Sequence, residues 1–404
     1  MGRALIIILT GFIMLFTGFH LTIQQTERDS VSSAIQTYST AQARQIAESG
    51  INYMIAHLKF DPAWRGVKAG VPLLMGETDI TVINRADISA TAVEITSHGR
   101  FNTTEDSLSV VVDVQPVSSR FSRYSYFSNR EESIWFYSRD TLSGPVHTNG
   151  RFNMTGTPTF YGLVSSVSST YATMGYTNPH FYGGTNFGAP AVTLEPNFDD
   201  LNNAAANGGH SVSNYPLYLD FQSNGTYLYR VGSTGSWQSR SIPENGVIYC
   251  NRNIYVKGVV NGAVTLSSTR SIYITDDLVY ADNPESNPDS DDFTGLVAQT
   301  DVIIQNNSET RNGVIIQAAI LAKSGSFKAE NIDFSPSVPL ELWGGIVQEM
   351  RGAIGRLGSP PTGFEKRYYY DERMEYKYPP HYPIAPGSTE NLTEKAKITV
   401  YYWK

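Results

Sequence analysis

Residues 4–23 form an almost wholly apolar run without an acidic side chain, lysine or arginine. A helix needs roughly 20 such residues to cross a bilayer, and no later stretch of this chain has that character. A cleaved signal peptide has a shorter apolar core and a small-x-small cleavage site, which is missing here. A buried core helix is the other alternative. We expect a retained membrane anchor.

The pattern then changes from apolar to amphipathic without a break. Residues 24–58 contain no proline and only one glycine, Gly50. Their apolar side chains recur mostly every three to five positions, which predicts a helix with one buried stripe. The stripe consists of Val31, Ile35, Tyr38, Ala43, Ile46, Ile51, Met54, Ile55 and Leu58. Since Asp61-Pro62 should end the helix, we expect one helix of about 55 residues within a module over 1–60.

Polar and apolar positions alternate in three segments after this helix, 79–84, 92–97 and 108–114. Alternation is typical of strands with one buried face. We therefore expect a small antiparallel sheet over 61–119 that packs on the helix, which makes the N-terminal part an α+β module.

From about residue 120 the chain consists of short apolar segments separated by Gly, Asn, Asp and Pro. Within 247–280 a short strand is expected every 8–10 residues. The phrases NIYVKGVVNG, SIYITDDLVY, DVIIQNN and SFKAENI resemble one another. This regularity favours a mainly β domain over 120–360, of the β-solenoid type. A β-sandwich or jelly roll stays open as the alternative.

Composition and charge exclude some classes of function. The net charge of the 404 residues is −8 and no basic block is present, which argues against a nucleic-acid partner. Cys250 is the single cysteine, so the chain has neither an intrachain disulfide nor a thiolate metal site. Arg3 precedes the apolar run, and the positive-inside rule then places the N-terminus in the cytoplasm.

The segment Ala43–Tyr53, with its Ala-Glu-x-Gly stretch, resembles PilX-type minor pilins and type II secretion pseudopilins. Gly2–Ile7 is similar to the start of their processed helix. Ile7 stands where that family has a glutamate. The residues 144–162, and later 276–298 and 363–383, resemble a bacterial domain of unknown function that follows PilX-type N-termini.

This resemblance implies a structural role in a type IV pilus or related filament. The partners would be other pilins and the pilus assembly machinery, with the inner membrane holding the single-pass helix before assembly and the cell surface as the final location. Gly2 is then the candidate processing position, although an ordinary second residue is an equal alternative. The β domain would serve adhesion, with a surface glycan or cell ligand as partner. The alternative function is a permanently anchored surface protein that binds polysaccharide outside any filament.

Four residues of the long helix are candidates for its assembly: Arg44, Ala47, Glu48 and Gly50. The small residues would allow another helix to approach closely, and Arg44 lies one turn before Glu48, at a spacing that favours an ion pair.

The remaining candidates give no catalytic centre or cofactor site, so we expect no enzyme. His147, Asn149 and Gly150 lie in a Gly-Pro-Val-His-Thr-Asn-Gly turn and are expected to hold it by hydrogen bonds. The weak candidates for calcium are Asp289, Asp291 and Asp292, which lack the spacing of an EF-hand loop. The Tyr- and Pro-rich segment 361–404 should pack on the β domain.

Overall fold

The structure is a computed structural model that describes residues 2–194, 198–356, 358–385 and 395–403. The chain divides into two compact units. Unit 1 comprises Met1–Pro116 together with Thr393–Lys404, and unit 2 comprises Val117–Leu392. Unit 1 is therefore formed by residues that precede unit 2 in the sequence together with residues that follow it. The predicted order, a long N-terminal helix followed by a mainly β part, is confirmed.

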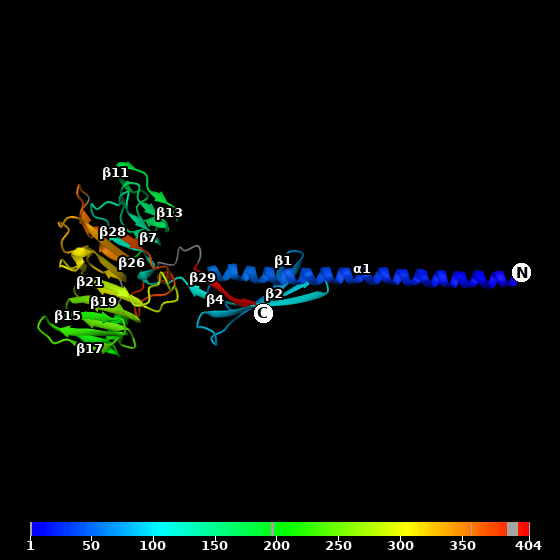
Figure 1. The fold of residues 1–404 in the computed structure, drawn as a ribbon. Coiled ribbons are helices and arrows are strands. Elements are labelled where there is room, and N and C mark those ends of the chain that lie inside the picture. The colour runs from blue at the N-terminus through cyan, green and yellow to red at the C-terminus, as the bar shows by residue number, and fades with distance from the viewer. Residues whose placement is uncertain (1, 195–197, 357, 386–394, 404) are drawn as a thin grey trace. The chain divides into compact units, whose positions relative to one another are not determined.

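Helix α1 runs without interruption over Gly2–Phe60 (Figure 1). It ends where Asp61 donates its backbone N–H to the carbonyl oxygen of His57 at 3.0 Å, because Pro62 then has no N–H with which to continue. The prediction of one helix that stops at Asp61-Pro62 is confirmed.

A five-stranded antiparallel sheet covers the second half of α1. The predicted strands at 79–84, 92–97 and 108–114 are all present, whereas the two edge strands were not predicted. In spatial order the strands are β1 (Gly66–Leu73), β2 (Gly76–Asn84), β3 (Ala92–Phe101), β4 (Thr104–Pro116) and β29 (Ala396–Trp403).

The core of unit 1 lies between this sheet and one face of α1. Ile51, Met54 and Leu58 are fully buried against Ile80 and Val93 of the sheet. The predicted stripe is thus buried from Ala43 onward except for half-buried Ile55, while its earlier members stay exposed.

The expectation that the C-terminal segment 361–404 packs on the β domain is wrong for residues 396–403. The first part of the segment forms a strand of unit 2, and Tyr370 and Tyr382 are buried in that unit. Residues 396–403 instead pair with β4 of unit 1 as β29. Residues 386–394 lie outside the described residues.

Unit 2 consists mainly of parallel ladders, in which strands from successive passes of the chain lie side by side. We call these ladders together the stack. In spatial order, the first ladder comprises β14 (His210–Val212), β18 (Val247–Cys250), β20 (Ala263–Ser268), β22 (Phe293–Ala298), β24 (Val314–Ala322), β26 (Val338–Met350), β5 (Tyr126–Arg130), β7 (Val146–Thr148), β10 (Val164–Ser166) and β13 (Thr185–Phe187).

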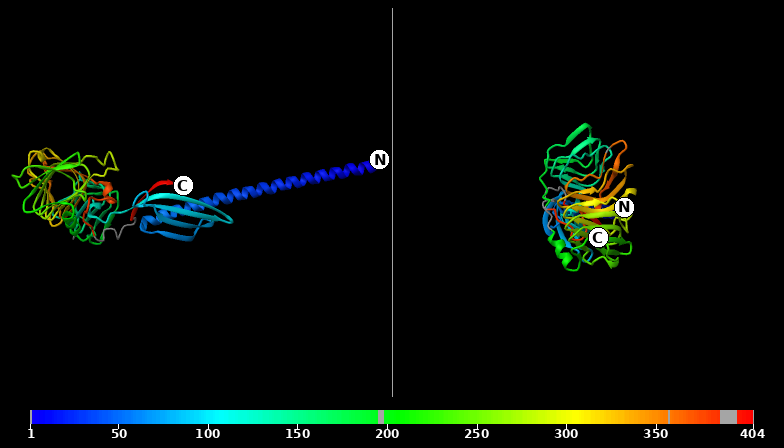
Figure 2. Two further views of the ribbon diagram at one scale, coloured as in Figure 1. Left: turned by 90° about the horizontal axis from the view of Figure 1, so that it is seen from below. Right: turned by 90° about the vertical axis from the view of Figure 1, so that its left-hand side faces the viewer.

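Two further ladders complete the stack. The second comprises β15 (Leu217–Gln222), β19 (Ile254–Val260), β21 (Ile272–Tyr280), β23 (Val302–Ile304) and β25 (Phe327–Ala329). The third continues from β24 and β26 through β28 (Thr362–Tyr369), β6 (Thr141–Leu142), β9 (Thr159–Phe160) and β12 (His180–Phe181). The left view of Figure 2 looks along the stack, and its passes overlie one another.

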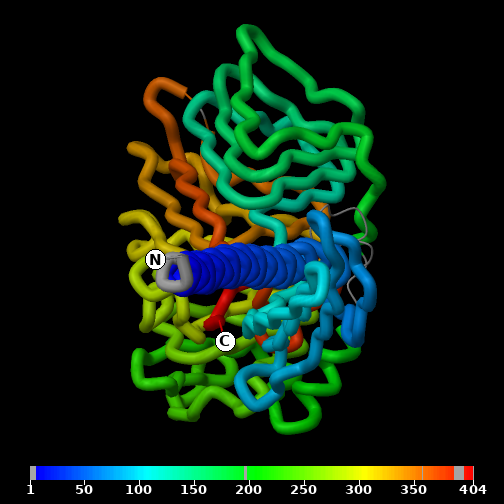
Figure 3. The backbone as a smooth tube through the Cα atoms, turned by 90° about the vertical axis from the view of Figure 1, so that its right-hand side faces the viewer, coloured from blue at the N-terminus to red at the C-terminus, as the bar shows by residue number. Residues whose placement is uncertain are grey.

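The chain does not fill the stack in sequence order. It enters in the middle at β5, builds to one end at β13, and then crosses to the opposite end at β14. From there it returns pass by pass until β26 lies beside β5. Figure 3 shows the result as green tube at both ends of the unit with orange tube between them.

One row of side chains runs through the whole first ladder at equal register. Leu266, Leu296, Ile320, Ile346 and Tyr126 are successive partners, and each is buried. The row continues through Val146 and Val164 and ends at Thr185, which is exposed. Stacking of like apolar side chains is what makes each pass bury the next.

The other elements of unit 2 lie around the stack. Helix α2 (Asp199–Ala206) contacts β14 and β18. Strands β16 (Thr226–Val231) and β17 (Gln238–Ser241) extend β15 as an antiparallel meander. The shorter elements are β8 (Asn153–Gly156) paired with β11 (Ala172–Thr177), β27 (Gly355–Arg356) paired with β28, and three 3-10 turns at Phe121–Arg123, Thr310–Asn312 and Glu372–Glu375.

Candidate functional site

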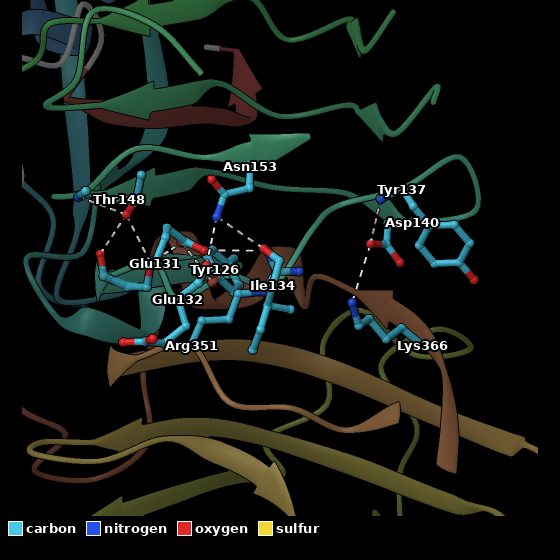
Figure 4. A network of polar contacts seen from close by, with 12 residues as sticks. Tyr126, Glu131, Glu132, Ile134, Tyr137, Asp140, Thr148, Asn153, Arg351 and Lys366 are labelled. Carbon is cyan, nitrogen blue, oxygen red and sulfur yellow. Dashed lines mark hydrogen bonds and ion pairs between the residues drawn. The ribbon is translucent and has the colours of Figure 1, made fainter. Parts of the chain in front are cut away.

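A network of charged side chains lies where β5 and β6 meet β26 and β28 (Figure 4). The Arg351 guanidinium is 3.5 Å from the carboxylate of Glu131, and these side chains are only 4% and 1% exposed. The Glu131 carboxylate also accepts hydrogen bonds from the hydroxyls of Tyr126 and Ser128. The Arg351 guanidinium lies 3.7 Å from the ring centroid of Phe136. Both buried charges are thus compensated within the protein.

A second pair stands beside the first. The Lys366 ammonium is 3.4 Å from the carboxylate of Asp140, which also accepts the backbone N–H of Tyr137 at 3.1 Å. Burial lowers the pKa of Lys366 against the opposing pull of Asp140. Burial, and secondly the Glu131 carboxylate, raise the pKa of Tyr126 well above its ordinary value. Such shifts are expected for charges that are closed off from solvent. The network joins the early passes of the stack, which carry Glu131 and Asp140, to the late passes, which carry Arg351 and Lys366.

An open cleft lies on the outer side of this network. It holds about 1740 Å³, counting the solvent at its mouth, and Trp135, Tyr137 and Arg139 line one wall. Two of its charged side chains are paired, since Lys366 contacts Asp140 and Arg356 lies 2.7 Å from Asp333. The cleft offers aromatic and hydrogen-bonding surface beside these paired charges, and Arg139 in its wall is exposed.

The predicted turn residues lie in the first ladder, at and just after β7. The side chain of Asn149 accepts a hydrogen bond from the backbone N–H of Val192 at 2.9 Å, so the His147 Nε2, 3.0 Å from the same oxygen, acts as donor. The His147 Nδ1 then accepts from the hydroxyl of Ser165 at 2.8 Å. Burial lowers the pKa of His147, which favours this neutral form. Gly150 donates its N–H to the hydroxyl of Thr148. These contacts hold a loop in place.

The three aspartates proposed as weak calcium ligands are not brought together as a site. The carboxylate of Asp292 is buried and accepts the backbone N–H groups of Gly262 and Asp282. Asp289 and Asp291 are exposed. Within the described ranges, no group of three or more His, Cys, Asp or Glu side chains could hold a metal ion.

The four assembly candidates of α1 divide between two faces. Ala47 and Gly50 are buried against the sheet of unit 1, where a Cβ added at Gly50 would lie 2.2 Å from the Ser97 hydroxyl oxygen. This placement differs from the expectation that they admit a second helix. Arg44 and Glu48 are exposed, and Arg44 pairs with Asp106 at 3.8 Å rather than with Glu48 as expected.

The first half of α1 has no covering within the chain. Its large apolar side chains between Ile6 and Tyr38 are all exposed. In the described part of the chain, α1 is the one helix long and apolar enough to cross a membrane, which is compatible with the predicted anchor. Gly2 is the first residue of the helix, and nothing in its backbone distinguishes a processing site.

Residues 87–169 match the model of a domain of unknown function, DUF4900. The match includes the 144–162 segment that carried one of the resemblances, but it ends before the later two. No curated protein matches the chain.

Among solved structures, the chain is similar to the competence-associated pilin ComZ from Thermus thermophilus. The two share 10% sequence identity at a TM-score of 0.36, over 91% of this chain and 97% of that one.

Sequence reasoning missed the buried network because its partners are distant in the chain. Glu131 and Arg351 are separated by 220 positions, and Asp140 and Lys366 by 226. The only local signal was that charged residues flank short apolar segments, which is also the pattern of ordinary loops.

Proposed function

We propose that this chain is a structural subunit of a type IV pilus or related filament, of the minor-pilin kind. Helix α1 is held in the inner membrane before assembly, is passed to the assembly machinery, and then packs with the helices of other pilins. Unit 2 is the part that the filament presents at the cell surface for adhesion. The role is structural rather than catalytic.

The observation that carries this proposal is an apolar stripe beyond the reach of the lipid. A helix crosses the bilayer core with roughly 20 residues, which the segment 4–23 supplies. Val31, Ile35 and Tyr38 follow on one face, at positions i, i+4 and i+7, and are 59%, 60% and 52% exposed. Ile35 lies about 18 Å past residue 23, at 1.5 Å per residue. Since lipid does not cover that stripe, another protein helix is the natural partner.

The architecture of each unit supports the same role. In unit 1 the second half of α1 is fixed on a sheet, so the exposed first half projects from a folded base. In unit 2 the parallel ladders and their apolar rows support a β-solenoid rather than a sandwich or jelly roll, whose sheets are mainly antiparallel. A solenoid gives a long surface on a rigid core, which suits display.

The second candidate is a permanently anchored surface protein that binds polysaccharide. The residue at position 7 favours it, because Ile7 replaces the glutamate expected in processed pilins of this kind. This candidate needs only the membrane and unit 2, and it assigns no partner to Val31 and Ile35.

A matched pair of variants separates the two candidates. Ile35→Glu places a charge on the apolar stripe, and Thr37→Glu places the same charge on the opposite, exposed face of α1. We expect Ile35→Glu to lower the amount of chain released by shearing surface fibres at least about tenfold, since burial of an unpaired charge between helices costs more than 1.4 kcal/mol. Thr37→Glu should behave as the unchanged chain.

Two outcomes contradict the filament proposal. One is that the unchanged chain stays wholly in the membrane fraction after shearing. The other is that both variants assemble equally well. N-terminal sequencing of the mature protein tests maturation separately, since pilin-type cleavage after Gly2 leaves Arg3 first.

A further inference from the structure

The segment 152–194 carries no aspartate, glutamate, lysine or arginine. Such residues make up 17% of the chain, so about seven are expected in these 43 positions. The segment is instead rich in Tyr, Phe, Ser, Thr, Asn and Gly. In the structure, this uncharged segment forms one complete end of the stack.

This end is open. Its outermost strands are β11, β12 and β13, and among the described residues each pairs with a single strand, namely β8, β9 and β10. Their other edges present unpaired backbone N–H and C=O groups. We call the surface of residues 161–187 at this end the open end.

Exposed aromatic and sulfur-containing side chains gather at the open end. Tyr176 is 75% exposed and Tyr182 is 68% exposed, and Met174 on the same strand as Tyr176 is also exposed. Tyr182 stacks on Tyr161 with the ring centroids 5.3 Å apart and the planes within 14°. The open end therefore exposes large side chains, and the stacking on Tyr161 fixes the orientation of the Tyr182 ring.

A half-buried aromatic layer supports this surface from below. Phe181 stacks on buried Phe160 at 5.5 Å and contacts the rings of Tyr171 and Phe187 at 6.0 and 5.9 Å. Because these rings pack on the core of unit 2, the open end is a rigid platform. Binding there costs little conformational entropy.

We propose that the open end binds a neutral carbohydrate chain. Tyrosine with serine, glycine and asparagine is the composition of surfaces that combine rigid contact area with adaptable hydrogen bonding. Sugar hydroxyls can pair with the hydroxyls, amides and free strand edges, and the apolar faces of sugar rings can lie on the tyrosine rings. The composition favours a ligand without charge, because an ionic ligand would find no aspartate, glutamate, lysine or arginine of this segment as a counter-ion.

The shape of the edges argues against a protein strand as the occupant. β12 has two residues and β13 has three, too few for a stable added strand. The longer β11 is interrupted at Gly175, whose φ is +64°, and its register with β8 shifts there. Short and broken edges can bond single hydroxyls but offer no continuous ladder.

The test uses the full chain in detergent micelles, so that it does not depend on filament formation. The probes are three neutral polymers, dextran, mannan and a β-1,3-glucan, and one acidic polymer, alginate. We expect binding to at least one neutral polymer, with an affinity that changes less than twofold between about 50 mM and about 500 mM NaCl, because no charge is involved. Alginate should not bind.

Variants locate the binding. Tyr176→Ala and Tyr182→Ala should each weaken it at least about fivefold, and the double variant by more. Tyr215→Ala is the matched control, since Tyr215 is 61% exposed and lies before β15, away from the open end. All four proteins should keep the same thermal unfolding midpoint.

Several outcomes overturn the proposal: binding of none of the neutral polymers, binding to alginate alone, a strong loss of affinity with salt, or equal weakening by Tyr215→Ala. Self-association that Tyr176→Ala abolishes would identify a second copy as the occupant instead. The proposal adds a ligand class to the display role above, but the two fail separately, because shearing tests α1 and this experiment tests unit 2.

Discussion

The two ends of the stack in unit 2 differ in whether other elements cover their outermost strands. At one end, strand β15 is covered by β16 and β17, and helix α2 lies against β14. At the other end, β11, β12 and β13 pair with no further strand of the described chain. We call the first the capped end. Residues 199–244, which build it, include six charged side chains, whereas 152–194 include none.

The capped end shows how a stack of parallel ladders can end in a polar surface. The last strand, β17, has the sequence Gln-Ser-Arg-Ser and is fully exposed, so its free edge is polar. Arg230 lies over the rings of Tyr218 and Trp237, at 4.5 and 5.0 Å from their centroids. Capping repeats with a polar outer face are the usual solution for this architecture. The open end lacks that protection, and a binding role gives a physical reason for its exposed tyrosines.

The largest expected effect concerns the attachment of the open end to the rest of the stack. Arg351→Ala leaves the buried carboxylate of Glu131 without its cation, which costs about 3–5 kcal/mol. We expect hydrogen exchange to accelerate in β5, β7 and β10 while the capped end stays protected. Urea unfolding in micelles measures the free energy.

The matched control is Arg130→Ala, which removes a surface ion pair with Glu349 and should cost less than about 1 kcal/mol. If both variants lose the same free energy of unfolding, the buried Arg351–Glu131 pair does not hold the passes of the stack together more strongly than a surface pair does.

The second prediction compares a phenylalanine from each end. Phe221 of β15 is 2% exposed and has strands on both sides, so Phe221→Ala should cost about 3–5 kcal/mol. Phe181 of β12 packs on one side only, and Phe181→Ala should cost about half as much. Urea unfolding of both variants checks this, and a larger loss at Phe181 would show that the open end carries the stability.

The third prediction uses the ionisable group of the capped end. Burial, and secondly the positive charge of Arg240, lower the pKa of His210 to about 4. Between pH 6.5 and 4 the unfolded chain binds this proton and the folded chain does not. Stability contributed by the neutral histidine is therefore present above pH 6.5 and is lost as the pH falls towards 4.

Hydrogen exchange at pH 7 and pH 5, corrected for intrinsic rates, should show the loss in β14 and β16, where the His210 Nδ1 lies 2.7 Å from the Tyr227 hydroxyl. His210→Gln should remove the pH dependence. If the slope persists in that variant, another group is responsible.

Local patterns in the sequence were enough for the elements whose partners are near in the chain. Helix α1 was predictable because its apolar run and its stripe follow each other directly. The strands at 79–84, 92–97 and 108–114 were predictable because their alternation reflects one buried face. β1 was missed since Gly70, Pro72 and the irregular pairing between Lys68 and Val71 disturb that alternation.

Long-range pairing could not be predicted in the same way. No local pattern indicates that β5 lies beside β26, or that the stack is entered in its middle, because the pairing depends on which apolar rows meet. At the candidate sites, the small residues Ala47 and Gly50 were expected to admit a second helix. Their partner is the sheet of the same chain, and spacing alone cannot distinguish a sheet from another helix.

Strand β29 has a consequence for biosynthesis. It completes the sheet beneath α1 by pairing with β4, yet residues 117–395 are translated between them. The ribosome therefore delivers the final strand of unit 1 only after the whole of unit 2 has emerged. Chains that stop before β29 leave Val110 and Val112 of β4 at an unpaired edge of the sheet, where a strand of another chain can pair. Pairing of β29 with β4 therefore completes unit 1 only in molecules that already carry the residues of unit 2.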